Sequence, residues 1–492
     1  MLYKINQYKS SLYNLALLVV LTWPAAGCKK FIAVDVPVTS VNAGNVYKDN
    51  STATAVLTDI YSNLSQREPT TAVPDEALTG VSFATELSAD NLTLFYKSNT
   101  RMLAFYENKL LPAGTPSGVY FWDRCYEFIY RVNAAIEGIT ASGSLTPAVK
   151  QQLLGECRFF RGFFYFYLLN LYGDVPLVLT TDYKQNALLS RTASVTVYNQ
   201  ILADLLEAKQ LLNEQYVGID MVTTGTERLR VNRSAARAML ARVYLYLGNY
   251  AEAEAEATAV INNSLYGLLT GSIGDTFLKN SKETIWSLQP VQSATQNTWE
   301  GKVFLMTAAG PGASRPVYLS NDLVATYASA DKRLANWIGS VKVGSTTYYY
   351  PAKYKAGSAV TTLVEYDIVL RLAEQYLIRA EARAKQNNLT GTGSAIIDLN
   401  VIRNRAGLSD TTITVQENML NAILLERRKE LFTEWGHRWF DLKRTGKIDA
   451  VMQAYAPVKG TTWESYKSLY PIAQKQIDLN PGMAGQQNPG YN

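Results

Sequence analysis

Histidine is nearly absent from this sequence, which has only His437 among its 492 residues. A single imidazole excludes most metal sites built on histidine ligands and most proton relays and triads that depend on this side chain. The chain also lacks a glycine-rich loop of the P-loop or dinucleotide-binding type. We therefore expect no metal and no cofactor, although pairs of Asp and Glu could in principle still make a glycosidase.

Cysteine is also scarce, with only Cys28, Cys125 and Cys157. Cys125 and Cys157 fall in segments with a helical pattern, and buried free thiols are their expected state, although pairing in an oxidising compartment stays open. The excess of positive charge is small, with 47 Lys and Arg against 42 Asp and Glu. Such a balance argues against nucleic acid as a partner.

The first 27 residues have the pattern of a bacterial export signal. Lys4 and Lys9 precede an apolar run at residues 15–21, which is too short to span a membrane permanently. Ala25, Ala26 and Gly27 stand directly before Cys28 and resemble a lipobox, although Leu is more usual at the first of these three positions. The alternative is an ordinary cleaved signal followed by an incidental cysteine.

These features predict three parts of the chain. Residues 1–27 are expected to be a lipoprotein signal peptide, and residues 28–45 a tether that is lipidated at Cys28. Residues 46–492 are expected to form one folded domain, because no Pro/Ser-rich or single-sign charged linker divides them. Acyl chains on Cys28 would anchor this domain to a membrane without a transmembrane helix.

Apolar residues recur at helical spacing through much of the chain, which predicts a mainly α-helical fold. The segments are 52–64, 119–139, 147–172, 196–212, 233–247 and 250–262. Residues 233–261 read as a tetratricopeptide-like helix pair, with small Ala residues for close approach and Gly248 at the turn. A second pair is predicted at residues 369–405, with its helices at about 369–384 and 394–405. Such pairs must stack to bury their apolar faces.

Two irregular segments, about 65–118 and 264–364, interrupt this helical pattern. The second contains a predicted β-hairpin at residues 337–350, with Gly344 and Ser345 at its turn. Irregular segments over a rigid scaffold are common places for binding sites, and amphipathic aromatic rings within them can contact a ligand. The candidate ligand-binding residues are Asn91, Phe95, Tyr96, Trp299, Tyr318 and Trp337. The alternative for each is packing against the scaffold.

Several long motifs resemble the SusD/RagB family, in the order expected for it and along essentially the whole chain. Residues 156–178 end in Tyr172-Gly-Asp-Val-Pro-Leu-Val178, and residues 426–432 are followed by Gly436-His-Arg-Trp-Phe-Asp-Leu-Lys-Arg-Thr-Gly446. The tail at residues 470–481 is similar to the family ending, with Ala473 where a second Pro is common. The charged residues at 426–430, Arg438 and Asp441 are expected to form ion pairs rather than an anion site.

This resemblance implies a SusD-like fold with four tetratricopeptide-like units and an anchor in the outer leaflet of the outer membrane. It also implies a SusC-like TonB-dependent barrel as partner and a nutrient ligand, usually an oligosaccharide, which the protein would deliver to that barrel. The resemblance thus favours a binding protein that is not an enzyme, and two other functions stay open. One is a surface glycan hydrolase, and the other is a structural lid of the transporter with little ligand affinity.

Lipidation of Cys28 is directly testable by metabolic labelling. Labelled palmitate should enter the wild-type protein and be absent from Cys28→Ala, because the thiol is the acceptor of the acyl chain. Cys125→Ala, which leaves the lipobox intact, is the matched control and should label like the wild type. Equal labelling of the wild type and Cys28→Ala would contradict the assignment.

Overall fold

The structure is a computed structural model that describes residues 45–65, 78–113, 119–291, 297–357, 360 and 362–491. Cys28 and the predicted signal peptide lie outside the described residues. Residues from Tyr47 onward form one compact unit, and the description below concerns that unit alone. None of the described helices is both long enough and apolar enough to cross a membrane.

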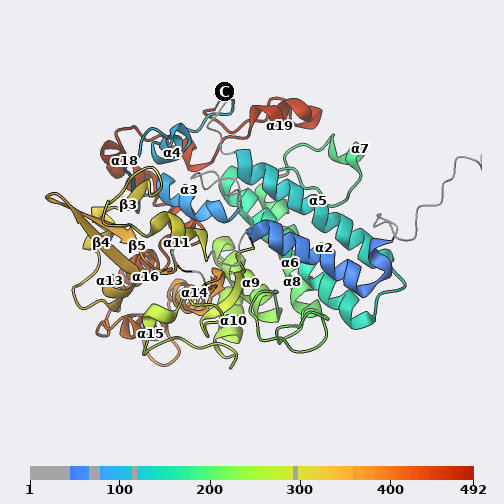
Figure 1. Ribbon diagram of the computed structural model, residues 1–492, viewed down its shortest axis with the longest axis horizontal. Helices are drawn as coiled ribbons and strands as arrows, with labels where there is room; N and C mark the ends of the chain where they lie inside the picture. The colour runs from blue at the N-terminus through green and yellow to red at the C-terminus, as the bar shows by residue number, and fades with distance from the viewer. Residues whose placement is uncertain are drawn as a thin grey trace, which may run out of the picture. The chain divides into compact units, whose positions relative to one another are not determined.

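The unit is mainly helical, as predicted (Figure 1). Its α-helices are α2 (Asn50–Ser65), α3 (Val81–Ser88), α4 (Thr100–Tyr106), α5 (Val119–Ala141), α6 (Pro147–Tyr172), α7 (Tyr183–Asn186), α8 (Ser194–Leu211), α9 (Arg233–Leu247), α10 (Tyr250–Ile261), α11 (Trp299–Phe304), α12 (Asn321–Ala325), α13 (Lys332–Trp337), α14 (Leu372–Lys385), α15 (Ala395–Arg405), α16 (Gln416–Glu430), α17 (His437–Arg444), α18 (Ile448–Lys459) and α19 (Gln474–Leu479). Short 3-10 turns are η4 (Leu78–Gly80), η5 (Ile273–Asp275), η6 (Ser465–Ser468) and η7 (Pro481–Met483).

The strands are short and form three two-stranded antiparallel sheets among the described residues. They are β1 (Leu92–Leu94) with β3 (Val317–Leu319), β2 (Thr284–Leu288) with β6 (Asp367–Arg371), and β4 (Ile338–Val343) with β5 (Thr346–Pro351). The β4–β5 pair is the predicted hairpin. Gly344 at its turn has φ +61°, a backbone conformation that favours glycine.

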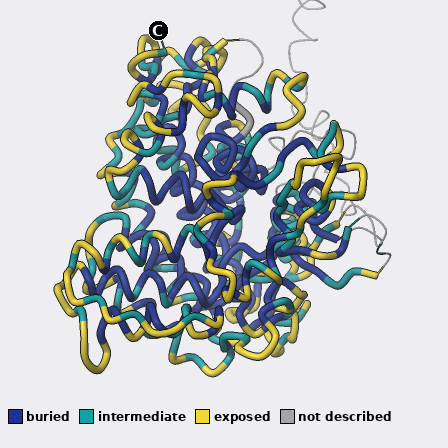
Figure 2. The backbone as a smooth tube through the Cα atoms, turned by 90° about the vertical axis from the view of Figure 1, so that its left-hand side faces the viewer, coloured by how far each residue is buried: buried dark blue, intermediate teal, exposed yellow. Residues whose placement is uncertain are grey.

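Successive long helices pack side by side, and each buries the apolar stripe of its neighbour. α5 lies against α6, α6 against α8, α8 against α9, α9 against α10, α10 against α14, and α14 against both α15 and α16. Buried residues follow the interior of these layers, whereas exposed residues gather at the turns (Figure 2). The rings of α6 are core, because Phe159, Phe160 and Phe163 all meet the buried Trp286 edge-on.

The α9–α10 pair confirms the prediction for residues 233–261. Gly248 ends α9 with φ +77°, which lets the chain turn back at once. Ala241, Ala253 and Ala257 are buried between the two helices and share one cluster with Ala382 of α14. Small side chains therefore allow the close approach that the sequence predicted.

Two predictions of local structure were wrong. Val369 begins no helix but lies in β6, since Ile368, Val369 and Leu370 are buried against β2 and extend the chain before α14 starts at Leu372. The segment 65–118 is less irregular than predicted, because it contains α3 and α4. α3 is buried at every position, so its apolar residues show no one-sided helical pattern.

Cys125 on α5 and Cys157 on α6 are buried free cysteines, as expected. Burial raises the pKa of both thiols far above their ordinary range, so both stay protonated. They behave as small apolar side chains of the core.

Glu86 on α3 is a buried acid with an unusual titration. Its side chain is 0% exposed, and burial raises its pKa from 4.5 to about 7, although the Asn91 side chain and the backbone at Thr433 favour the charged form. In the unfolded chain this carboxyl releases its proton near pH 4.5, whereas in the folded protein it keeps the proton up to about pH 7. Folding stability from Glu86 is therefore full below pH 4.5 and is lost as the pH rises to about 7.

Replacement of Glu86 by Gln should remove this loss. As the pH rises from 4.5 to 8, the free energy of unfolding of Glu86→Gln should increase relative to that of the wild type by up to about 3 kcal/mol, because the amide cannot ionise. Urea unfolding of both proteins across this pH range measures the difference. Glu464→Gln, at an exposed position, is the control. A difference between Glu86→Gln and the wild type that does not change with pH would show that Glu86 keeps its ordinary titration.

Candidate functional site

The candidate site begins at the small sheet formed by β1 and β3. Leu92, Leu94, Val317 and Leu319 are buried on one face of this sheet. Thr93 and Tyr318 stand directly opposite each other and are both partly exposed on the other face. This arrangement follows from the two-residue period of a strand, which turns alternate side chains to opposite faces.

The β4–β5 hairpin lies beside this sheet and supplies a third ring (Figure 1). The ring of Tyr348 meets Tyr318 edge-on at 5.2 Å between centroids, and it meets Phe95 edge-on at 5.8 Å. We call Phe95, Tyr318 and Tyr348 the aromatic cluster. Phe95 is 46% exposed, and the neighbouring Tyr96 is 38% exposed. The cluster thus joins three segments far apart in the sequence and remains open to solvent.

The start of β1 is held by a buried clamp from the C-terminal helices. Arg438 donates to both oxygens of the Asp90 carboxylate at 2.7 and 2.8 Å, and Arg428 lies 2.9 Å from the same group. Although burial opposes ionisation, these two guanidinium groups bring the pKa of Asp90 down to about 2. Ser320 beside β3 donates its hydroxyl to the Asp90 carbonyl at 2.7 Å. The clamp therefore fixes β1 and β3, whereas the third ring of the cluster comes from β5.

The six residues predicted from the sequence lie in different places. Phe95 and Tyr318 come together in the aromatic cluster, and Tyr96 follows Phe95 at the surface. Trp299 starts α11 and is half-buried, with its ring edge-on to Phe83 at 5.6 Å. Its neighbour is thus α3, and the segment predicted to be irregular is helical at this point.

Asn91 and Trp337 are fully buried, so neither is open to a ligand in this structure. The Asn91 side-chain oxygen accepts a hydrogen bond from Arg428 Nε at 2.8 Å, which makes it part of the clamp. Trp337 donates its indole N–H to the carbonyl of Ile273 and packs against the cations of Arg405 and Lys353. Packing inside the scaffold, the alternative considered above, describes both.

Sequence reasoning missed Tyr348, the residue that links the other two rings. The signal was present in the predicted hairpin, because strand alternation after the Gly344 turn places Tyr348 and Tyr350 on one face. The ring of Tyr350 covers Gly339 on the paired strand, where a Cβ would lie 2.3 Å from it. Tyr348 lies on the same face next to β3, where its ring contacts Tyr318.

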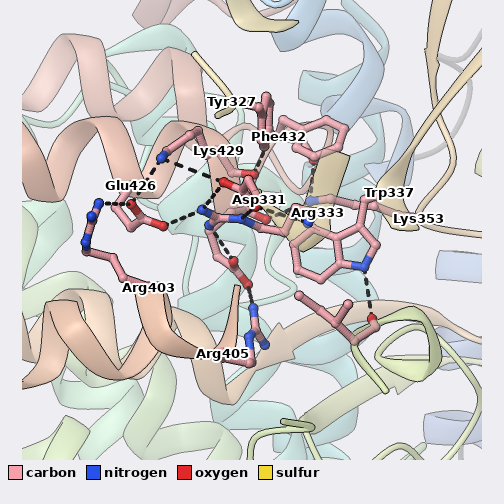
Figure 3. A network of polar contacts seen from close by, with 12 residues as sticks. Tyr327, Asp331, Arg333, Trp337, Lys353, Arg403, Arg405, Glu426, Lys429 and Phe432 are labelled. Carbon is pink, nitrogen blue, oxygen red and sulfur yellow. Dashed lines mark hydrogen bonds and ion pairs between the residues drawn. The ribbon is translucent and has the colours of Figure 1, made fainter. Parts of the chain in front are cut away.

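The charged C-terminal motif forms ion pairs, as predicted, and not an open anion site. Glu426 contacts Arg333 (Figure 3), as does Glu430, and Arg427 contacts Asp441 at 2.7 Å. His437 is buried in the same region, where burial and the nearby Arg242 and Arg427 hold its pKa well below 6.5. The imidazole is therefore neutral at physiological pH and unsuited to proton transfer there.

Comparisons with known proteins agree with this architecture. A model described as "SusD family" matches residues 295–491, and one described as "Starch-binding associating with outer membrane" matches residues 54–245. The SusD-like protein P38 of Formosa agariphila is 24% identical, with 94% of this chain and 96% of the relative covered.

Solved structures share the fold. A SusD superfamily protein from Parabacteroides distasonis has a TM-score of 0.73 at 22% identity, covering 90% of this chain and 98% of that chain. A laminarin-binding SusD-like protein has a TM-score of 0.70 at 22% identity, covering 90% and 100%. With SusD models matching both halves of the described unit and a relative aligned almost end to end, the chain belongs to the SusD/RagB family.

Proposed function

We propose that this protein is a non-enzymatic, lipid-anchored glycan-binding protein of the outer membrane that binds its ligand at the aromatic cluster. The observation that carries the proposal is the meeting of Phe95, Tyr318 and Tyr348 at a partly exposed surface. Tyr96 extends this surface, while Trp299 lies against α3 as a further candidate contact.

The chemistry of the cluster suits a sugar. A pyranose presents an apolar face of C–H groups with hydroxyls around its rim, and it is recognised by an aromatic ring below and polar groups at the edge. Tyr318 and Tyr348 offer both, since each combines a flat ring with a phenolic hydroxyl. The edge-on contacts also hold the rings at fixed angles, which lowers the entropy lost when a ligand is bound.

The relatives support the same ligand class. One matching family model is described by starch binding, and one structure with the same fold is a laminarin-binding protein. Both starch and laminarin are neutral glucans, and both would present the apolar sugar face that the cluster suits. An oligosaccharide is accordingly the proposed ligand. The titration below compares laminarin with starch and so tests which glycosidic linkage the protein binds.

The two alternatives make different demands on the protein. A glycan hydrolase normally needs two carboxyl groups flanking the scissile bond, whereas the cluster is built from rings and hydroxyls. Incubation of the purified protein with a glycan that it binds should leave the chain length of the glycan unchanged.

A structural lid with little affinity would bind no glycan and would support transport even after the cluster is mutated.

Truncation of Tyr348 should weaken glycan binding because the ring touches both other rings of the cluster. In calorimetric titration against laminarin and soluble starch, Tyr348→Ala should lose about 2 kcal/mol of binding free energy for whichever glucan the wild type binds, or roughly thirtyfold in Kd. Tyr130→Ala, at an exposed position on α5, is the control and should bind as the wild type does. Unchanged affinity of Tyr348→Ala would place the site elsewhere.

Delivery of the ligand to a SusC-like TonB-dependent barrel completes the proposed role. It rests on the resemblance of the sequence motifs and on the predicted lipid anchor, which would hold the protein beside such a barrel. Affinity purification from native outer membranes in mild detergent should recover a barrel of this type together with the protein. Recovery of the protein alone, with the detergent varied, would contradict a stable complex.

A further inference from the structure

The segments that form the aromatic cluster carry positive charge only. They are residues 92–106, from β1 to the end of α4, residues 305–320, between α11 and α12, and residues 338–351, the β4–β5 hairpin. These segments contain no Asp or Glu, whereas the whole chain has 42 of them among 492 residues. Their charged residues are Lys97, Arg101, Arg315 and Lys342. The cluster thus departs from the overall balance of charge.

Two of these cations lie close to the exposed rings of Phe95 and Tyr96. Lys97 directly follows Tyr96 in the chain and is itself exposed. Arg315 directly precedes Pro316, whose carbonyl accepts hydrogen bonds from the backbone amides of Phe95 at 2.8 Å and of Tyr96 at 3.1 Å. Two segments that lie far apart in the sequence therefore bring a cation to the same end of the cluster.

Both side chains are open to a ligand. Within the part of the chain that the structure describes, neither Lys97 nor Arg315 forms an ion pair. Arg315 donates its Nε–H to the carbonyl of Leu305, and its two Nη groups make no hydrogen bond to a described residue. A guanidinium with both Nη groups free can bind a carboxylate or a sulfate through two parallel hydrogen bonds.

The acidic residues that flank the three segments leave most of this charge uncompensated. Five of them are buried or already ion-paired. These five are Asp90, Glu107, Glu300, Asp331 and Glu365. The sixth, Asp322, is exposed in the first turn of α12, beyond the end of β3. The exposed surface beside the rings is therefore dominated by cations.

Arg101 and Lys342 act at longer range. Lys342 pairs with Thr347 in the register of the hairpin, one position from Tyr348, so it lies on the face opposite to that ring. Arg101 is half-buried in the first turn of α4. Both add to the positive field that attracts an anion toward the cluster.

We propose that the ligand of the aromatic cluster is an acidic oligosaccharide, whose carboxylate or sulfate groups are bound by Lys97 and Arg315. This inference rests on the proposed function, because it names the ligand class of the same site. The three rings of the cluster contact the apolar face of a sugar, whereas the two cations bind an acidic substituent at its rim. Charge complementarity of this kind selects acidic over neutral sugars, since a neutral sugar leaves the cations without a partner.

Ligands with matched backbones test the effect of charge alone. Short laminari-oligosaccharides and their sulfated derivatives share one backbone, and oligogalacturonate carries carboxylates instead. In calorimetric titration at low salt, the wild type should bind at least one of the two acidic ligands about tenfold more tightly than the neutral one. At about 1 M NaCl this preference should largely disappear, because the Debye length falls to about 3 Å. Preference for either acidic ligand supports the inference and identifies the acidic group.

Variants assign the preference to the two side chains. Lys97→Gln and Arg315→Gln should each weaken binding of the preferred acidic ligand roughly fivefold and change binding of the neutral one by less than about twofold. Arg315→Lys keeps the charge but loses the planar fork, so its affinity should be intermediate. Tyr348→Ala should weaken both ligands, because the rings contact the sugar itself. Lys184→Gln removes an exposed cation of α7, outside these segments, and is the control.

The outcomes separate this inference from the proposed function. Equal affinity for neutral and acidic ligands overturns the acidic preference and leaves the proposed glycan site standing. If the wild type binds none of the three ligands, the proposed site falls and this inference falls with it. An acidic preference that Lys97→Gln and Arg315→Gln leave unchanged, or that Lys184→Gln reduces equally, overturns the assignment. If Arg315→Gln lowers the melting temperature, Lys97→Gln decides, because Lys97 is exposed.

Discussion

The structure depends on a buried network of ion pairs centred on Glu430, at the end of α16. Its carboxylate forms ion pairs with Arg333 of α13, Arg371 of β6 and Arg405 of α15. The network also includes Lys353, Lys429, Asp331, Glu283, Glu426 and Glu434, so that five cations face five anions in the interior. Figure 3 shows the part around Arg333, where the partly exposed Arg403 also contacts Glu426. Removing charges from water is costly, and buried pairs offset this cost only with good geometry. The network therefore selects one arrangement of these elements, since any displacement would leave a charge unpaired.

The same helix connects this network to the strands beside the aromatic cluster. Arg428, two residues before Glu430 on α16, contacts Asp90 and Asn91 at the start of β1. Lys353, just past the end of the β4–β5 hairpin, contacts Glu434 and so ties the third ring of the cluster to the same region. The strands that carry Phe95, Tyr318 and Tyr348 are short, and a two-stranded sheet has little stability alone. Their positions are consequently set by charges in the scaffold.

The sequence predicted those parts whose signal is local. α6 and α9 begin and end at the predicted residues, because period, capping residues and Gly248 lie in one stretch of chain. Asn91 and Trp337 were chosen from local polarity and irregularity, yet both are buried by elements that lie far away in sequence. For Tyr348 the hairpin pattern gives the face of the strand but not the partner, since its contact with Phe95 joins residues about 250 positions apart. Local pattern identifies an element, whereas burial and ring contacts depend on the tertiary fold.

This separation explains how fold and ligand can vary independently in such a protein. The motifs that carry the family resemblance, at residues 156–178 and 426–446, supply core rings and ion pairs. The aromatic cluster comes from residues 95, 318 and 348, outside both motifs. A substitution in the cluster changes a partly exposed ring and leaves the buried charges paired, so the fold tolerates it. Removal of one partner of a buried ion pair in the motifs leaves the other charge unmatched, which costs several kcal/mol. Solved structures at 22% identity accordingly share this fold, although most of their residues differ from those of this chain.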